Sequence, residues 1–317
     1  MKIVMLDRKS IGADTPVMRL AELGELVIYD FTAESEVIER ISDAEIVVIN
    51  KIKMTSDVIK SAKKLRLICE FATGYDNIDI DAAKECGVAV TNVPGYSTDS
   101  VVLFTFATVL SLVTHMREYS DFVKNGEYTA SGCSNALEPV YHEIKGKTWG
   151  IIGCGNIGGT VARIAEAFGA RVIVNKRTAC SEYNCVDIDT LCRESDIITV
   201  HCPLNDGTRA LINKERISLM KPDVIIVNEA RGAVVCEDDI TNAILEKRIG
   251  AFGADVYTEE PFSAEHPFQK IKHLSNVLLT PHAAWGAYEA RERCLGYICE
   301  NISSFLNSGK KNRVDLL

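Results

Sequence analysis

The chain begins with a series of short apolar runs that alternate with longer segments of mixed polarity. These runs are residues 3–6, 26–29, 46–49, 65–69 and 88–91. Near-continuous apolarity over four or five residues is typical of strands that are buried on both faces of a parallel sheet. The segments between the runs have the composition of helices, so this part of the chain is predicted to be α/β.

A second series of apolar runs follows a long helical stretch. It comprises residues 148–152, 171–174, 197–201, 224–228, 250–254 and 277–280. Strands that alternate with helices in this way form doubly wound parallel sheets. The sequence therefore predicts two α/β domains, each with a doubly wound parallel sheet.

The boundary between the two series is expected near Pro94, Gly95 and Tyr96, because a helical run from 97 to about 123 leads from one series to the other. The C-terminal segment 288–307 is again helical, with Ile298 and Ile302 on one apolar face, and is expected to return to the first domain. The predicted division is residues 1–96 with 287–317 for one domain and 97–286 for the other.

Length, charge and cysteine content narrow the class of protein. A chain of 317 residues suits two domains. Its formal net charge of -9 argues against nucleic acid or an anionic membrane as a partner. Eleven cysteines without a CxxC pair, behind a start unlike a signal peptide, indicate reduced thiols in a cytoplasmic protein. The longest apolar stretch, 101–113, is shorter than the roughly 20 residues of a membrane span.

A glycine-rich turn directly follows the apolar run 148–152 and precedes a predicted helix over 160–168. In a dinucleotide-binding turn the first glycine permits the tight bend, the second lets the backbone approach the pyrophosphate, and the third lets the helix pack on the strand. The order of strand, turn and helix favours a Rossmann dinucleotide site over an incidental glycine-rich turn. The turn comprises Gly153, Cys154, Gly155, Asn156, Ile157 and Gly158.

The residues after the run 171–174 bear on the choice of cofactor. An NAD site usually carries an Asp or Glu there, which binds the ribose 2′-hydroxyl. This chain has Lys176, Arg177 and Thr178 instead. Two cations and a hydroxyl suit a 2′-phosphate, so the sequence favours NADP(H), with NAD(H) still possible. The alternative is an exposed basic loop with no part in binding.

Three polar residues that follow predicted strands of the second series have the chemistry of a 2-oxo acid reductase: Arg231, Glu260 and His282. Hydride transfer to a ketone puts negative charge on its oxygen, so a proton donor must stand beside it and a cation must hold the substrate carboxylate. His282 is the candidate donor, Glu260 the carboxylate that orients it, and Arg231 the clamp. Asp255 is a candidate partner of the nicotinamide amide. Position beyond the carboxyl ends of strands favours these roles over solvated surface residues.

Several motifs together resemble those of the D-2-hydroxyacid dehydrogenase family over almost the whole chain. Residues 72–79 look like the family's substrate-binding loop and 92–101 like its domain linker, while 228–232, 255–261 and 281–282 match its Arg, Glu and His motifs. The resemblance implies that Arg231, Glu260 and His282 are catalytic. It also implies a Rossmann domain inserted in a flavodoxin-like substrate domain and a homodimer built through the former. By motif position, the residues beside the cofactor include His201, Cys202 and Pro203.

Within the family, residues 93–99 and 281–286 are most similar to glycerate dehydrogenases, also called hydroxypyruvate reductases. This likeness implies a small substrate such as hydroxypyruvate or glyoxylate. Leu103 stands where Gln or Glu is usual and Glu229 replaces a common Thr or Ser, and either change affects the polarity of the pocket. Lys51 fits a surface position as well as a substrate contact, and Tyr96 and Trp285 fit packing at the domain boundary as well as a place in the cleft. The candidate substrate residues are Lys51, Thr73, Gly74, Tyr96 and Trp285.

Two other functions remain open. One is a related dehydrogenase that acts on phosphite or formate, although formate dehydrogenases place Gln where Glu260 stands. The other is a corepressor-like protein that binds the dinucleotide as a conformational signal, although such proteins usually carry long additional tails. No metal site is predicted, because the histidines are dispersed and no paired cysteines have zinc-ligand spacing.

Overall fold

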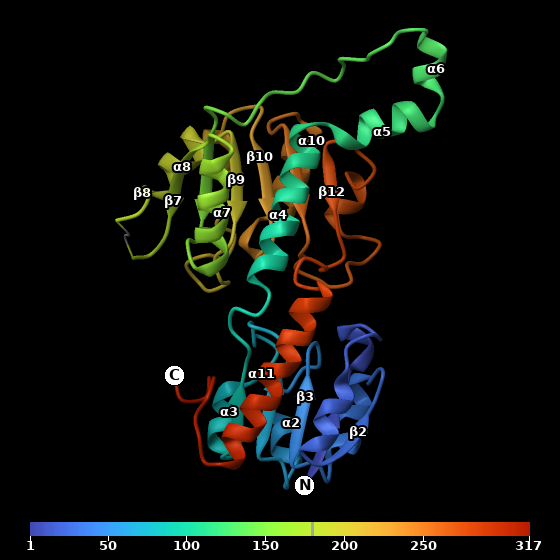
Figure 1. Cartoon of the computed structure of the whole chain (residues 1–317). Coiled ribbons are helices and arrows are strands. Elements are labelled where there is room, and N and C mark those ends of the chain that lie inside the picture. Colours follow the sequence, from blue (N-terminus) through green and yellow to red (C-terminus); the bar gives the residue numbers. More distant parts are fainter. Residues whose placement is uncertain (179–180) are drawn as a thin grey trace. The chain divides into compact units, whose positions relative to one another are not determined.

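The computed structural model describes residues 1–178 and 181–317, which divide into two compact units (Figure 1). The first unit consists of two chain segments, Met1–Ser97 and Trp285–Leu317, and the second is the continuous segment Thr98–Ala284. Each unit is built on its own parallel β-sheet. The predicted α/β class with two parallel sheets is confirmed.

The first unit contains a five-stranded sheet in the order β2-β1-β3-β4-β5, with every neighbouring pair parallel. Successive residues of a strand face opposite sides, so Val4 and Ile3 enter different cores. Both faces of the sheet are therefore apolar, as the near-continuous runs predicted. The strands are β1 (Lys2–Met5), β2 (Glu25–Ile28), β3 (Ile46–Ile49), β4 (Leu67–Glu70) and β5 (Ala89–Thr91).

The last helix of the chain covers one face of this sheet together with Ile11, Val17 and Leu20, and short helices cover the other face. The helix α11 (Tyr288–Leu306) contributes Cys294, Leu295, Ile298 and Ile302 to the core that contains Ile3. The C-terminal segment therefore returns to the first sheet. The other helices of this unit are η1 (Arg8–Ile11), η2 (Val17–Glu22), η3 (Glu34–Glu36), α1 (Val37–Ile41), α2 (Ser56–Ser61) and α3 (Ile80–Glu85).

The second unit contains a seven-stranded parallel sheet in the order β12-β11-β10-β9-β6-β7-β8. It consists of β6 (Thr148–Ile152), β7 (Arg171–Asn175), β8 (Asn184–Cys185), β9 (Ile197–Val200), β10 (Ile225–Asn228), β11 (Ala251–Ala254) and β12 (Val277–Leu279). The two-residue strand β8 was not predicted. It is too short and too polar to produce an apolar run.

Helices cover both faces of the seven-stranded sheet. On one face α4 (Thr98–Val113) and α7 (Asn156–Ala167) pack around Trp149, which is fully buried. The other face is covered by α8 (Ile188–Glu194), α9 (Lys214–Leu219) and α10 (Glu237–Leu245). Two short 3-10 helices follow strands of this sheet, η4 (Gly232–Val234) and η5 (Pro267–Lys270). The carboxyl ends of its strands thus carry the turns that hold the candidate site.

The helical run expected from 97 to about 123 is interrupted. The helix α4 ends at Val113, and α5 (Met116–Lys124) starts after His115, whose φ is +51°. The two helices meet at an angle of 65°. Over the residues that the structure describes, no single helix is long and apolar enough to cross a membrane, and α4 with α5 meets that criterion only as this bent pair.

Candidate active site

The glycine turn joins β6 to α7 in the second unit. Gly153 has a φ of +89°, and a Cβ on it would lie 2.6 Å from the Cys202 backbone nitrogen. A Cβ on Gly158 would lie 2.0 Å from the Gly153 carbonyl oxygen, whereas the space around Gly155 is open to 4 Å. The helix starts at Asn156, within the turn, and not at the predicted residue 160. Its first backbone amides therefore face the open side of the turn.

The basic residues after β7 lie beside this turn. Lys176 donates through Nζ to the Cys154 carbonyl oxygen at 3.4 Å. Arg177 and Thr178 are exposed. Asn175, the last residue of the strand, donates its side-chain amide to the Val186 carbonyl oxygen. The end of β7 thus brings a cation, and no carboxylate of its own, to the glycine turn.

The segment His201, Cys202 and Pro203 follows β9 and packs its backbone against Gly153. His201 donates its backbone N–H to the Ile152 carbonyl oxygen at 2.7 Å. Burial lowers the pKa of the His201 ring to about 3, and neither ring nitrogen has a hydrogen-bond partner among the described residues. Burial also raises the pKa of the Cys202 thiol to about 11, so this thiol is protonated at neutral pH.

Arg231 lies in a tight turn after β10. Asn228 shapes this turn, because its side chain accepts from the Ala230 N–H at 3.1 Å and donates to the Arg231 carbonyl oxygen at 2.9 Å. The next residue is Gly232, where a Cβ would lie 2.0 Å from the carbonyl carbon of Tyr257. The Arg231 turn therefore packs directly on the loop that carries Glu260.

Glu260 and His282 are in direct contact. The Glu260 Oε2 lies 2.6 Å from the His282 Nδ1, and the Glu260 Oε1 accepts from the Tyr257 N–H at 3.0 Å. Their side chains are 28% and 24% exposed. Glu260 is therefore oriented by the backbone of its own loop, and the pair remains accessible to a small molecule.

Asp255 holds the loop that carries His282. Its carboxylate, on a residue that is 1% exposed, accepts from the Thr280 Oγ1 at 2.7 Å and from the Ala283 and Ala284 N–H groups at 2.8 Å each. These bonds stabilise a turn in which His282 has a φ of +55°. The sequence suggested only a contact with the cofactor for Asp255, and nothing in the apolar pattern reveals this structural role.

Glu229 is buried beneath the same strand ends. It is 8% exposed and accepts from the Thr108 Oγ1 of α4 at 3.3 Å. Burial, and then the charge of Asp255, raise the pKa of the Glu229 carboxyl to about 8. This departure from the family pattern therefore puts a protonated acid under the site at neutral pH.

The candidate substrate residues lie in the first unit. Lys51 follows β3, and Thr73 and Gly74 follow β4, so these three share the carboxyl edge of neighbouring strands. Tyr96 is 3% exposed and lies edge-on to Trp285 at 6.2 Å in the core covered by α11. Its burial favours packing over substrate contact.

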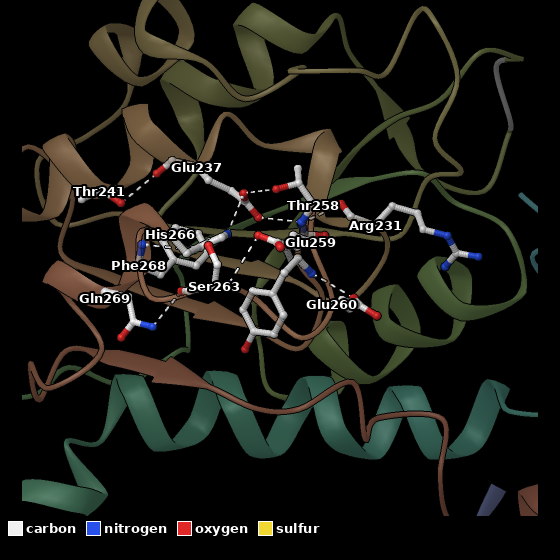
Figure 2. Close-up of polar contacts among 12 residues, drawn as sticks. Arg231, Glu237, Thr241, Thr258, Glu259, Glu260, Ser263, His266, Phe268 and Gln269 are labelled. Atoms are coloured by element: carbon white, nitrogen blue, oxygen red, sulfur yellow. Dashed lines mark hydrogen bonds and ion pairs between the residues drawn. The ribbon is translucent and has the colours of Figure 1, made fainter. Parts of the chain in front are cut away.

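A second carboxylate and histidine pair, Glu237 and His266, lies behind the loop that carries Glu260 (Figure 2). This pair was not predicted from the sequence. The two residues are far apart in the chain, and Glu237 stands among other acidic residues in the first turn of a helix. Among the described residues, no group of three or more His, Cys, Asp or Glu side chains is placed to hold a metal ion.

The family model and the most similar curated relatives agree on one family. The family model "D-isomer specific 2-hydroxyacid dehydrogenase, NAD binding domain" matches residues 106–284. A hydroxypyruvate reductase of Blautia hydrogenotrophica is 36% identical, and the match covers 99% of this chain and 100% of the relative. A glyoxylate reductase of Thermococcus litoralis is 37% identical over 80% of this chain and 77% of its own.

Two solved structures extend the likeness over the full chain. One is an acyclic imino acid reductase in complex with NADPH and D-arginine, with a TM-score of 0.89, 32% identity, and coverage of 99% of this chain and 100% of the other. The other is a D-lactate dehydrogenase from Aquifex aeolicus with NAD and lactic acid, with a TM-score of 0.87, 30% identity, and 99% of both chains covered.

Proposed function

The chain belongs to the D-isomer specific 2-hydroxyacid dehydrogenase family, and we propose that it reduces a small 2-oxo acid to the D-2-hydroxy acid with Arg231, Glu260 and His282. As a member of this family it is an NAD(P)-dependent oxidoreductase. The observation that carries the proposal is the 2.6 Å contact between Glu260 and His282 on loops that follow β11 and β12.

In the proposed reaction His282 protonates the substrate oxygen. Its Nδ1 faces Glu260, so Nε2 is the nitrogen that delivers the proton. The Glu260 carboxylate fixes the ring and stabilises the charged imidazolium before the transfer. Arg231 binds the substrate carboxylate through its planar guanidinium and places the carbonyl for attack. A bound nicotinamide dinucleotide supplies the hydride that adds to the carbonyl carbon.

The chain's own residues fit such a cofactor. The open space around Gly155 and the backbone amides at the start of α7 form a cradle for a pyrophosphate, which the positive end of the helix also favours. Asp255 and the segment His201, Cys202 and Pro203 follow strands of the same sheet. We propose these residues as cofactor contacts.

The proposed substrate is hydroxypyruvate or glyoxylate. This choice rests on the curated relatives, which are named hydroxypyruvate reductase and glyoxylate reductase. Lys51, Thr73 and Gly74 are the proposed substrate residues of the first unit, with backbone amides near Thr73 and Gly74 as donors to a carboxylate.

The decisive experiment compares turnover of the parent protein with that of His282→Ala and Arg231→Ala on a panel of 2-oxo acids. The panel contains hydroxypyruvate, glyoxylate, pyruvate and a branched acid, each with and without ammonium, together with formate and phosphite as donors. Each variant should lose roughly 100-fold or more in kcat, because both residues act where charge develops. His273→Ala, a change of an exposed histidine in the same unit, is the control and should keep the parent rate.

Three results would contradict the proposal. Nearly unchanged turnover in His282→Ala or Arg231→Ala would remove these residues from catalysis. If the fastest reaction is with formate, with phosphite or with a 2-oxo acid plus ammonium, the proposed substrate class is wrong. Dinucleotide binding without turnover of any compound would favour the corepressor-like function.

For the cofactor, the proposal is a preference for NADPH over NADH. The support is the place of Lys176 beside the glycine turn and the absence of an acid in the segment 171–178. The double variant Lys176→Asp with Arg177→Ala should reverse the ratio of the two kcat/KM values, because a carboxylate repels the 2′-phosphate and accepts from a 2′-hydroxyl. Equal use of both cofactors by the parent would contradict this preference.

The proposed assembly is a homodimer formed through the second unit. The segment with α5 and α6 (Glu127–Ser131), together with the residues that follow it, exposes several large apolar side chains. A double change, Leu137→Asp with Tyr141→Asp, should yield monomers in light scattering, because a charge in an apolar interface is costly. A monomeric parent would contradict the dimer. The exposed apolar residues are Met116, Val123, Tyr128, Leu137, Val140 and Tyr141.

A further inference from the structure

The loop between β11 and η5 is anchored by a buried contact between a carboxylate and an imidazole, which is separate from the Glu260 and His282 contact. Glu237, the first residue of α10, and His266 have side chains that are only 7% and 4% exposed. The Glu237 Oε2 lies 3.0 Å from the His266 Nε2. A buried carboxylate beside a buried imidazole is costly unless every polar atom is satisfied, so the remaining contacts of the pair decide what it does.

The hydrogen bonds determine which nitrogen of His266 carries its proton. The His266 Nδ1 accepts from the Phe268 N–H at 3.2 Å, as the N-cap of η5. The hydrogen therefore resides on Nε2, which donates to Glu237. Phe262 stacks on the imidazole at 4.7 Å, so the ring is held on its face as well as at both nitrogens.

Glu237 uses its other contacts to hold Thr258. The Glu237 Oε1 accepts from the Thr258 N–H at 2.9 Å, and Oε2 accepts from the Thr258 hydroxyl (Figure 2). His266 thus binds the Glu237 carboxylate, and that carboxylate holds both the backbone N–H and the hydroxyl of Thr258. The result is a clamp across one residue of the Glu260 loop.

Thr258 lies between two parts of the proposed catalytic site. The peptide of Tyr257 and Thr258 is the one against which Gly232, next to Arg231, packs without room for a Cβ. The preceding N–H, that of Tyr257, holds the Glu260 Oε1 at 3.0 Å, and the Tyr257 hydroxyl donates to the Thr280 carbonyl oxygen at 2.7 Å. Movement of this peptide would therefore displace the Arg231 turn, the Glu260 carboxylate and the His282 loop together.

We propose that Glu237 and His266 are positioning residues that hold the Thr258 peptide and thereby fix Arg231 and Glu260 for proton transfer. Both side chains are buried, so we expect them to act through the residues that they hold. The inference rests on the proposed function of Arg231, Glu260 and His282, since a position matters only if the positioned groups react. A loss of position by about 1 Å is enough to slow a reaction roughly 100-fold.

Two substitutions at position 266 separate positioning from bulk packing. His266→Gln keeps an amide N–H at the distance of Nε2 and can still donate to Glu237. His266→Asn keeps an acceptor at the distance of Nδ1 for the Phe268 N–H but cannot reach Glu237. Both remove the aromatic ring and its stacking on Phe262, and each keeps one of the two hydrogen bonds of the ring, so the contact with Glu237 is separated from the contact with Phe268.

The measurements are kcat, KM and the Kd for NADPH from fluorescence titration. His266→Asn should lower kcat by about 10- to 100-fold, with KM within about threefold and the NADPH Kd within about twofold of the parent. His266→Gln should restore most of kcat. Equal kcat in the two variants, or a parallel loss of NADPH binding in His266→Asn, would show that the pair supports only the fold and would overturn the proposal.

A second variant keeps the test decisive if His266→Asn does not fold. Glu237→Gln presents an amide N–H to at least one of the donors from Thr258 and His266, and should lower kcat in the same way. A parent-like kcat in Glu237→Gln overturns the proposal.

A spectroscopic measurement separates failure of this inference from failure of the proposed function. In protein labelled with ¹⁵N-histidine, the hydrogen on the His266 Nε2 should give a slowly exchanging resonance that is absent in His266→Asn and weakened in Glu237→Gln. A parent with this resonance and no turnover of any acid contradicts the proposed function. A parent that turns over but lacks the resonance contradicts the clamp.

Discussion

The buried carboxyl of Glu229 gives a quantitative link between pH and stability. Glu229→Gln replaces this acid by a neutral group of the same shape. In the folded protein, burial raises the pKa of Glu229 to about 8 from a usual value of 4.5, and the charge of Asp255 adds to the effect. Folding therefore retains a proton that the unfolded chain releases at neutral pH.

The sign and the size of the effect follow from this difference. Below pH 4.5 both states of the parent carry the proton, and above pH 8 both have lost it. Between these values the free energy of unfolding falls as pH rises, by about 1.4 kcal/mol per pH unit. By pH 7 the parent should have lost about 3 kcal/mol relative to pH 4.5 through this group, whereas Glu229→Gln loses nothing through it.

The assay is urea unfolding of both proteins at pH 5, 6, 7 and 8, with tryptophan emission as the signal that monitors unfolding. The chain has two tryptophans, so a Trp285→Phe background leaves Trp149, which is fully buried in the second unit, as the reporter. The free energy of unfolding of Glu229→Gln should rise relative to its parent from pH 5 to pH 8. Glu215→Gln, which removes an exposed carboxylate, is the control and should follow the parent. Parallel curves for Glu229→Gln and the parent would refute the reasoning.

Three further substitutions test the packing that supports the site. Gly158→Ala should lower the free energy of unfolding by about 1–3 kcal/mol and weaken NADPH binding, because its Cβ would lie 2.0 Å from the Gly153 carbonyl oxygen. Urea unfolding measures the first effect and fluorescence titration the second. Thr199→Val should cost about 1–3 kcal/mol in the same unfolding assay, because Trp149 Nε1 donates to its hydroxyl at 3.1 Å inside the core. Gly232→Ala should reduce kcat in steady-state kinetics and leave the NADPH Kd unchanged, because the added methyl displaces the loop behind Glu260. If any of the three variants behaves like the parent, the role given to the contact that it changes is wrong.

Most of the architecture was predictable from the sequence. Strands that are buried on both faces leave unbroken apolar runs, and helices at an α/β sheet fill the intervals, so the fold class was identified correctly. The family was identified from the resemblance of its motifs. The break between α4 and α5 was not predicted. It occurs at His115 in a left-handed conformation, without a glycine or proline to mark it. The start of α7 was placed late because its first residues double as the glycine turn.

Residues of the site were predictable from the sequence only where they lie in a recognisable motif. Arg231, Glu260 and His282 each follow a strand and fall in a recognisable segment, and they remain predictions of function. Glu237 reads as an ordinary acidic residue in the first turn of a helix, where Glu and Asp are common. Its burial follows from the fold of a loop about 20 residues further on, and local sequence does not encode that fold.

The first unit is assembled from two segments that are synthesised at different times. Residues 1–97 leave the ribosome while α11 is still untranslated, so the face of the five-stranded sheet that includes Ile3, Met5, Ile46 and Val48 lacks the part of its cover that α11 supplies. The continuous second unit can complete its own core during this interval. A nascent chain that stalls before residue 285 would therefore display a folded dinucleotide domain beside a half-covered sheet, which makes it a substrate for chaperones or proteases.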